Sequence, residues 1–265
     1  MTHRIDQTFA ARAAANQAAF VAYMMAGDPD RTASQAFLNA LPGAGVDIIE
    51  LGIPFTDPMA DGPVIEEAGI RSRQSGTTLT SVLEMATKFR LTNRSTPIIV
   101  MGYANPLHHM GYTAFAAAAK TAGVDGAIIV DLPPEEDAEL RSAFETHDLA
   151  LIRLATPTTD AERLPRVVAG TKGFVYYVSM TGITGASFAQ AGSVKEQVAR
   201  VKTAADLPVV VGFGVKTPER AAEVAQDADG VVVGTAIVRS LHESGAEETL
   251  KFVKSLADAT HSARL

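Results

Sequence analysis

The chain has 265 residues with a formal net charge of −7 at pH 7, and 47% of its residues are hydrophobic. A surface of this charge repels nucleic acid and anionic membranes, so neither is an expected partner. The chain has no cysteine, which excludes disulfides and thiolate chemistry. It also lacks a signal-peptide pattern and any apolar run near the roughly 20 residues of a membrane span, so we expect a cytoplasmic protein.

The sequence predicts one domain over residues 1–265, because no Pro/Gly/Ser-rich linker or charged block divides it. Residues 1–17 are polar and predict a short amphipathic N-terminal helix. Eight apolar or β-branched runs follow and predict parallel strands that are covered on both faces. These runs span 19–26, 46–53, 97–104, 125–133, 149–155, 172–179, 207–214 and 229–234.

Helical patterns separate these runs. Residues 113–123 end in a glycine suited to the position after a helix, and residues 134–147 open with a proline and acidic residues. Residues 193–196 form a capping-box pattern, and 217–218 predict an N-cap threonine followed by proline.

Eight strands alternating with helices in about 250 residues predict a (β/α)8 TIM barrel with a short N-terminal helix and extra helices. The alternative is a doubly wound sheet, which favours G-x-G-x-x-G after an early strand. Here the first strand is followed by AGDPD, and the later GFGVKTPE has Thr217 in place of the third glycine.

The segment 47–63, DIIELGIPFTDPMADGP, places Glu50 near the end of a predicted strand and Asp61 in the proline-rich loop that follows. An unpaired carboxylate in apolar surroundings costs several kcal/mol unless it is protonated. Two carboxylates with different surroundings at one strand end suggest an acid/base pair. Spacing alone does not separate this role for Glu50 from a simple pairing with arginine or backbone donors. For Asp61 it favours a turn, because Asp61-Gly62-Pro63 is a good turn sequence.

The loops after the seventh and eighth strands are glycine-rich and precede helices, which predicts a phosphate cradle of backbone N–H groups. The loop after the sixth strand is long and built from small residues, so it is either a lid or an ordinary surface loop. Tyr176 and Tyr177 lie on that strand, and only one of them can face inward.

Two chemistries are disfavoured. A Schiff-base aldolase needs a lysine aimed into the pocket, and Lys216 is the single lysine that the predicted barrel places near its catalytic end. No metal site is expected, because the adjacent His108 and His109 have no third ligand nearby in the sequence.

The chain resembles the α subunit of tryptophan synthase over nearly its whole length. ELGIPFTDPMADGP matches the family's strand-2 motif, and AYMMAGDPD, MGYANP, VDLPPEE, SMTGITG, GFGVKTPE and GVVVGTAIV follow in the family's order. The resemblance implies a lyase that splits indole-3-glycerol phosphate by a retro-aldol reaction, in tryptophan biosynthesis, without metal or cofactor. It also implies a separate pyridoxal-phosphate β subunit as partner in an α2β2 complex, facing the strand-2 loop and the lid.

The resemblance implies roles for individual residues. Glu50 would be the principal acid/base, Asp61 would stabilise positive charge at the indole N–H, and Tyr176 would assist Glu50. The remaining site residues are Gly185, Gly214, Gly234 and Thr235 for the phosphate, Tyr23, Met101, Ile128 and Phe213 for the indole pocket, and Thr184 on the lid.

The sequence departs from the family pattern in four places. Thr235 replaces a serine, Met180 stands where some members have arginine, Arg153 interrupts the fifth strand, and residues 66–76 after the strand-2 loop are unusually polar. Three rival functions stay open. They are another phosphate-binding barrel enzyme such as the related indole-glycerol-phosphate synthase, a catalytically silent activator of a partner, and a stand-alone indole-releasing lyase.

Overall fold

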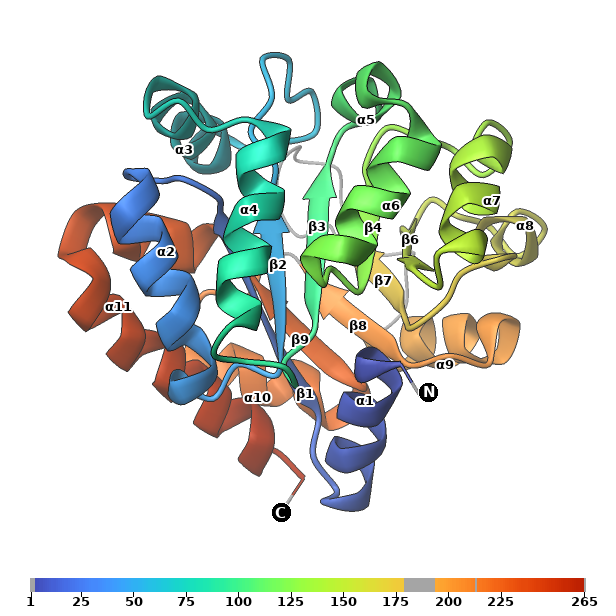
Figure 1. Cartoon of the computed structure of the whole chain (residues 1–265). Helices are drawn as coiled ribbons and strands as arrows, with labels where there is room; N and C mark the ends of the chain where they lie inside the picture. The colour runs from blue at the N-terminus through green and yellow to red at the C-terminus, as the bar shows by residue number, and fades with distance from the viewer. Residues whose placement is uncertain (1–2, 179–193, 213, 265) are drawn as a thin grey trace.

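The computed structural model of the chain describes residues 3–178, 194–212 and 214–264. In this part of the chain nine parallel strands form a nearly closed barrel, in the order β5-β4-β3-β2-β1-β9-β8-β7-β6 (Figure 1). The strands are β1 Ala19–Met25, β2 Ile48–Gly52, β3 Ile98–Gly102, β4 Gly126–Ile129, β5 Ala150–Leu151, β6 Arg153–Ala155, β7 Val175–Val178, β8 Val209–Gly212 and β9 Gly230–Val233.

The expected barrel is confirmed, with one difference in its fifth strand. The run predicted over 149–155 divides at Ile152 into β5, which pairs with β4, and β6, which pairs with β7. Ile152 itself donates its backbone N–H to the carbonyl of Ala127 at 3.0 Å. The barrel therefore closes through one strand that changes partners along its length.

Helices surround the barrel in the expected alternation (Figure 1). They are α1 Arg4–Ala14, α2 Arg31–Ala40, α3 Pro63–Gln74, α4 Leu79–Arg90, α5 Ala104–Met110, α6 Tyr112–Ala122, α7 Ala138–Thr146, α8 Leu164–Val168, α9 Val194–Ala205, α10 Pro218–Asp227 and α11 Thr235–Ser262, with a 3-10 turn at Leu41–Ala44. The backbone of α11 is non-helical at Gly245, where the helix bends. No helix in the described ranges is long and apolar enough to cross a membrane.

Two of the predicted helix ends are confirmed and one is wrong. Gly123 follows α6 with φ 81°, and Thr217 accepts the backbone N–H of Arg220 as N-cap of α10. However, α7 begins at Ala138 rather than Pro134, because residues 134–136 form a turn and the buried side chain of Asp137 is engaged by arginines. The capping box predicted at 193–196 includes Ser193, which lies outside the described residues.

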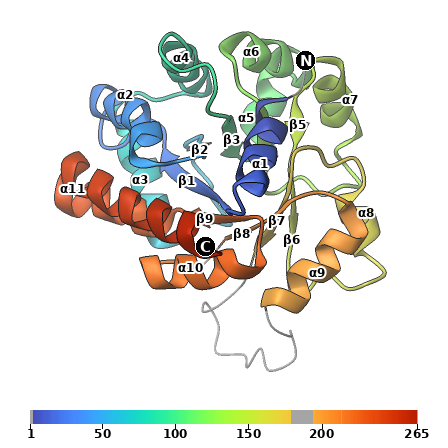
Figure 2. The same cartoon turned by 90° about the horizontal axis from the view of Figure 1, so that it is seen from below.

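The N-terminal helix α1 covers the end of the barrel from which the strands start, as the view from below shows (Figure 2). Its fully buried Ile5 and nearly buried Phe9 belong to the cluster of side chains inside the barrel. The Phe9 ring packs on Phe174 with centroids 5.7 Å apart. This closure leaves the opposite end, where the strands finish, as the open mouth.

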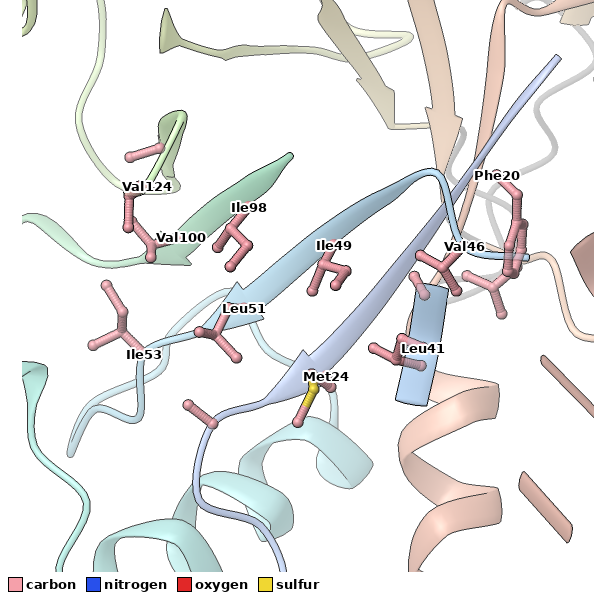
Figure 3. Close-up of a cluster of buried hydrophobic side chains, with 14 of the residues drawn as sticks. Phe20, Met24, Leu41, Val46, Ile49, Leu51, Ile53, Ile98, Val100 and Val124 are labelled. Carbon is pink, nitrogen blue, oxygen red and sulfur yellow. The ribbon is translucent and has the colours of Figure 1, made fainter. Parts of the chain in front are cut away.

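Each strand divides its side chains between the barrel interior and the layer of helices. On β2, Ile49 and Leu51 join the outer cluster with Phe20 and Val100, shown in Figure 3. The alternate residues face inward, and one of them is Glu50.

Candidate active site at the carboxyl ends of the strands

Glu50 lies inside the barrel without a partner. It is 1% exposed, and neither carboxylate oxygen has a hydrogen-bond partner among the described residues. Loss of hydration in this apolar interior raises the pKa of Glu50 from its usual 4.5 to about 8. Within the described chain, this excludes the simpler interpretation of Glu50 as the partner of an arginine or of backbone donors.

Two tyrosines flank Glu50, and each is accommodated by a glycine. Tyr23 lies opposite Glu50 in the β1–β2 register. A Cβ added to Gly52 would lie 2.2 Å from the Tyr23 hydroxyl, and one added to Gly212 would lie 2.2 Å from the Tyr176 hydroxyl. Both glycines are therefore required for the rings to take these positions.

The pKa values of both tyrosine hydroxyls are raised well above 10. Burial is the main cause for each; the charge of Asp61 and then of Glu50 adds to it for Tyr23, and the charge of Glu50 for Tyr176. The hydroxyls are therefore neutral donors near the carboxylates. Tyr177, in contrast, belongs to the outer cluster, so Tyr176 is the inward-facing member of the pair.

Asp61 occupies a different environment at the end of the β2–α3 loop. Its backbone N–H donates to the carbonyl of Pro58 at 2.9 Å, which closes a turn over residues 58–61. The turn predicted at 61–63 is wrong, because Gly62 is the N-cap of α3 and Pro63 its first residue. The side chain of Asp61 is half-buried and hydrogen-bonded to Tyr103. Burial raises the pKa of Asp61, the Tyr103 hydrogen bond lowers it, and the charge of Glu66 raises it.

Tyr103 is a functional candidate that the sequence did not single out. Its hydroxyl accepts the backbone N–H of Ala60 at 3.1 Å, and its ring stacks on Phe55 at 5.4 Å. It thus binds the loop at two points, besides its contact with Asp61. Its position directly after β3, the neighbour of β2, is the signal that could have identified it.

A second feature absent from the sequence-based prediction fixes helix α3, which begins directly after Asp61 and Gly62. Arg71 of α3 forms a bidentate ion pair with the buried Asp28, at 2.6 and 3.0 Å. Ser75 also donates to the carbonyl of Gly27 at 3.0 Å. These contacts tie α3 to the loop after β1, the strand that carries Tyr23.

The predicted phosphate cradle is described in part. Gly234 is the N-cap of α11 and Thr235 its first residue, so the backbone N–H groups of the first helical turn lie at this end of the barrel. A Cβ on Gly234 would lie 3.3 Å from Tyr23, so the position is crowded. Gly214 has φ +81°, a conformation that favours glycine. Gly185 lies outside the described residues.

The predicted indole pocket is also described in part. Met101 and Ile128 are register partners on β3 and β4, and Met101 packs against both the interior cluster and the cluster that contains Tyr23. The predicted wall residue Phe213 lies outside the described residues, and so do the lid residues Thr184 and Met180.

Arg153, noted as an interruption of the fifth strand, does not enter the pocket. It alternates with the inward-facing Ile152 and Leu154, and it forms an ion pair with Asp137 on the outer side of the strand. Among the residues that the structure describes, no group of three or more His, Asp or Glu side chains could hold a metal ion.

The chain matches the family model described as tryptophan synthase alpha chain over residues 9–264. This chain belongs to that family. A tryptophan synthase alpha chain of Caulobacter sp. (strain K31) is 53% identical, over 99% of this chain and 98% of the relative.

Solved structures agree with this relationship. Tryptophan synthase subunit alpha from Legionella pneumophila str. Paris superposes with a TM-score of 0.89 at 38% identity, over 98% of this chain and 99% of the other. A chain of tryptophan synthase from Mycobacterium tuberculosis gives a TM-score of 0.90 at 38% identity over 100% of both chains. The expected family, its lyase function in tryptophan biosynthesis and the TIM barrel are thereby confirmed.

The burial of Glu50 predicts a pH dependence of stability. Because the folded-state pKa of about 8 exceeds the usual 4.5, folding takes up a proton between these values, and stability falls as pH rises through this window. The variant Glu50→Gln lacks this contribution. The free energy of unfolding of each protein is measured by urea titration. Between pH 5 and 8, the difference between the variant and the original chain should grow in favour of the variant by at most about 1.4 kcal/mol per pH unit. Parallel stability profiles for the two proteins would contradict the assignment.

Proposed function

We propose that this chain cleaves indole-3-glycerol phosphate to indole and glyceraldehyde 3-phosphate, with Glu50 and Asp61 as its acid/base and charge-stabilising groups. The observation that carries the proposal is the buried Glu50, whose two oxygens lack partners in the described chain and whose pKa is raised to about 8. A carboxyl group in this state holds its proton near neutral pH and can release it to a substrate.

The reaction requires one bond to break and one proton to change place. The bond between indole C3 and the first glycerol carbon breaks, C3 gains a proton, and the hydroxyl on that carbon loses its proton to become the aldehyde. We assign both transfers to Glu50, which gives its proton to C3 and regains one from the hydroxyl. Tyr176, a neutral hydroxyl near Glu50, assists by orienting the reacting groups.

Asp61 has the complementary task. Protonation of C3 places positive charge on the indole nitrogen, and an ionised carboxylate near its N–H stabilises that charge. Burial raises the pKa of Asp61, and the hydrogen bond from Tyr103 opposes that rise, so this bond supports the ionised form that the role requires. Two carboxylates at one strand end would thus work in opposite protonation states.

The substrate's other two parts are assigned to the remaining residues. We place the phosphate at the backbone of Gly214, Gly234 and Thr235 near the start of α11, with Gly185 from the loop after β7. The flat apolar indole would contact Tyr23, Met101 and Ile128, with Phe213 as a further wall and Thr184 on the lid.

We expect Glu50→Gln to keep the fold and bind substrate but to lower the rate of indole release by roughly 100- to 10,000-fold, the usual effect of losing one acid/base group. The measurement is indole formation from indole-3-glycerol phosphate. Glu247→Gln, which removes an exposed carboxylate on α11, is the matched control and should retain activity. Near-normal turnover by the Glu50 variant would disprove the mechanism.

The phosphate assignment is tested at Thr235. A carboxylate introduced by Thr235→Glu would repel the phosphate, so the KM for the substrate should rise about tenfold or more while kcat changes less. Thr235→Ser keeps the hydroxyl and should behave like the original chain. An unchanged KM in the glutamate variant would place the phosphate elsewhere.

Tryptophan synthase alpha chains act with a beta chain, and we propose that this chain forms an α2β2 complex in the cytoplasm. The cofactor pyridoxal phosphate is assigned to the β subunit alone. The β2–α3 loop supports a partner surface at the barrel mouth, because Met59 at its tip is 79% exposed. An indole-release assay with and without a β subunit would separate this assignment from a stand-alone lyase.

The partner surface is tested with two exposed apolar side chains at opposite ends of the barrel. Met59→Asp should weaken binding to the β subunit at least tenfold in a titration, because a charge would be buried in the interface. Leu91→Asp, at the end of α4 and 77% exposed in the original chain, is the control and should bind normally. Equal affinity of the two variants would exclude this loop from the interface.

A further inference from the structure

A cavity of about 360 Å³ lies at the point where the fifth barrel strand changes partners. Because β5 pairs with β4 and β6 pairs with β7, the end of β4 and β6 are not joined by a described ladder. The lining is mixed. Its apolar part includes Ile129, Leu132, Leu151, Ile152, Leu154 and Val167, and its polar part includes Asp131, Asp137, Arg153, Thr159 and Arg163. Glu50, Asp61 and Tyr176 are not part of this lining, although Ile152 and Leu154 are shared with the inward-facing cluster that contains Tyr176.

Arg153 lines this cavity, and only some of its hydrogen-bond donors have partners among the described residues. It is 6% exposed, and one end of its guanidinium pairs with Asp137. Its Nε and Nη1 atoms have no hydrogen-bond partner among the described residues. Buried donors of a charged group that lack acceptors are costly, and an acceptor placed in the cavity would remove that cost.

The charges around Arg153 favour an anion. Asp137 is shared between Arg153 and Arg141, whose Nε lies 3.3 Å from it, so two guanidiniums face one carboxylate. Arg163 at the lining is paired with Glu135 at 3.1 Å. The other lining carboxylate, Asp131, is exposed and accepts the backbone N–H of Ala104 at 2.8 Å. The charges of the lining as a whole balance, but at Asp137 two guanidiniums face one carboxylate, so the unpaired positive charge lies at the Arg153 end of the cavity.

We propose that this cavity, here called the Arg153 cavity, binds a small monocarboxylate with an apolar body. The carboxylate would accept hydrogen bonds from Arg153, and the apolar body would pack on Leu132, Leu151 and Val167. The volume lies within the range of small-molecule pockets. The two unpartnered donors of Arg153 and the apolar part of the lining favour a monoanion of this kind over phosphate, which carries more charge and no apolar surface.

The test is calorimetric titration of the full chain with phenylacetate and with phenylacetamide, which has the same shape but no charge. We expect one site for phenylacetate and at least tenfold weaker binding of the amide, because charge-assisted hydrogen bonds are lost. Binding should persist in Glu50→Gln and in the presence of saturating glycerol 3-phosphate. Such persistence distinguishes the Arg153 cavity from the catalytic site whether or not the proposed function holds.

Arg153 is tested directly with Arg153→Lys, which keeps a charge beside Asp137 but lacks the planar set of donors. We expect at least tenfold weaker binding of phenylacetate, whereas Arg166→Lys, an exposed arginine outside the lining, should bind normally. The double variant Arg153→Leu/Asp137→Leu removes both buried charges and should fold but not bind, which covers the case in which the lysine variant fails to fold. No binding by the original chain, equal binding by the Arg153 variants, or displacement by glycerol 3-phosphate would each overturn the proposal.

Discussion

The constraint on which the candidate site depends is a carboxylate kept inside an apolar barrel without a counter-ion. Two arginines near this end of the barrel are engaged elsewhere: Arg71 pairs with Asp28, and Arg153 points outward to Asp137. Glu50 is therefore left to burial alone, which raises its pKa to about 8. The free-energy cost of burying this carboxyl group is offset by the packing of the two apolar clusters on either side of the strands. A functional group of this kind requires a large, well-packed core.

The second carboxylate, Asp61, lies in a more polar environment than Glu50. Asp61 leaves the strand on a loop that Tyr103, from the neighbouring strand, binds through its hydroxyl and its stacked ring. One carboxyl group thus lies in a dry interior and the other at a hydrogen-bonded edge. Both raise the pKa of Tyr23, so they act on a common space although their surroundings differ. This difference in environment is the basis for assigning them separate tasks in the chemistry of the tryptophan synthase alpha family.

The barrel is regular except at its fifth strand, and that irregularity has consequences. The cavity beside Arg153 lies where the ladder of β5 with β4 ends and the ladder of β6 with β7 begins. The arginine that looked like an interruption of the strand pattern is instead a residue of the outer layer, held by a shared aspartate. The engagement of Asp137 is also the reason that α7 starts later than its proline suggested.

The sequence by itself determined the barrel, the order of its strands and the position of Glu50 at a strand end, because strands buried on both faces leave near-continuous apolar runs in the local sequence. It also identified the glycines before α11 and the family motifs around Asp61. Only the tertiary structure decided that Glu50 has no partner in the described chain, that Tyr103 holds Asp61, that Asp28 and Arg71 fix α3, and that Arg153 faces outward. Each of these contacts joins residues that are far apart in the sequence. The local sequence pattern does not show which distant residues the fold brings together.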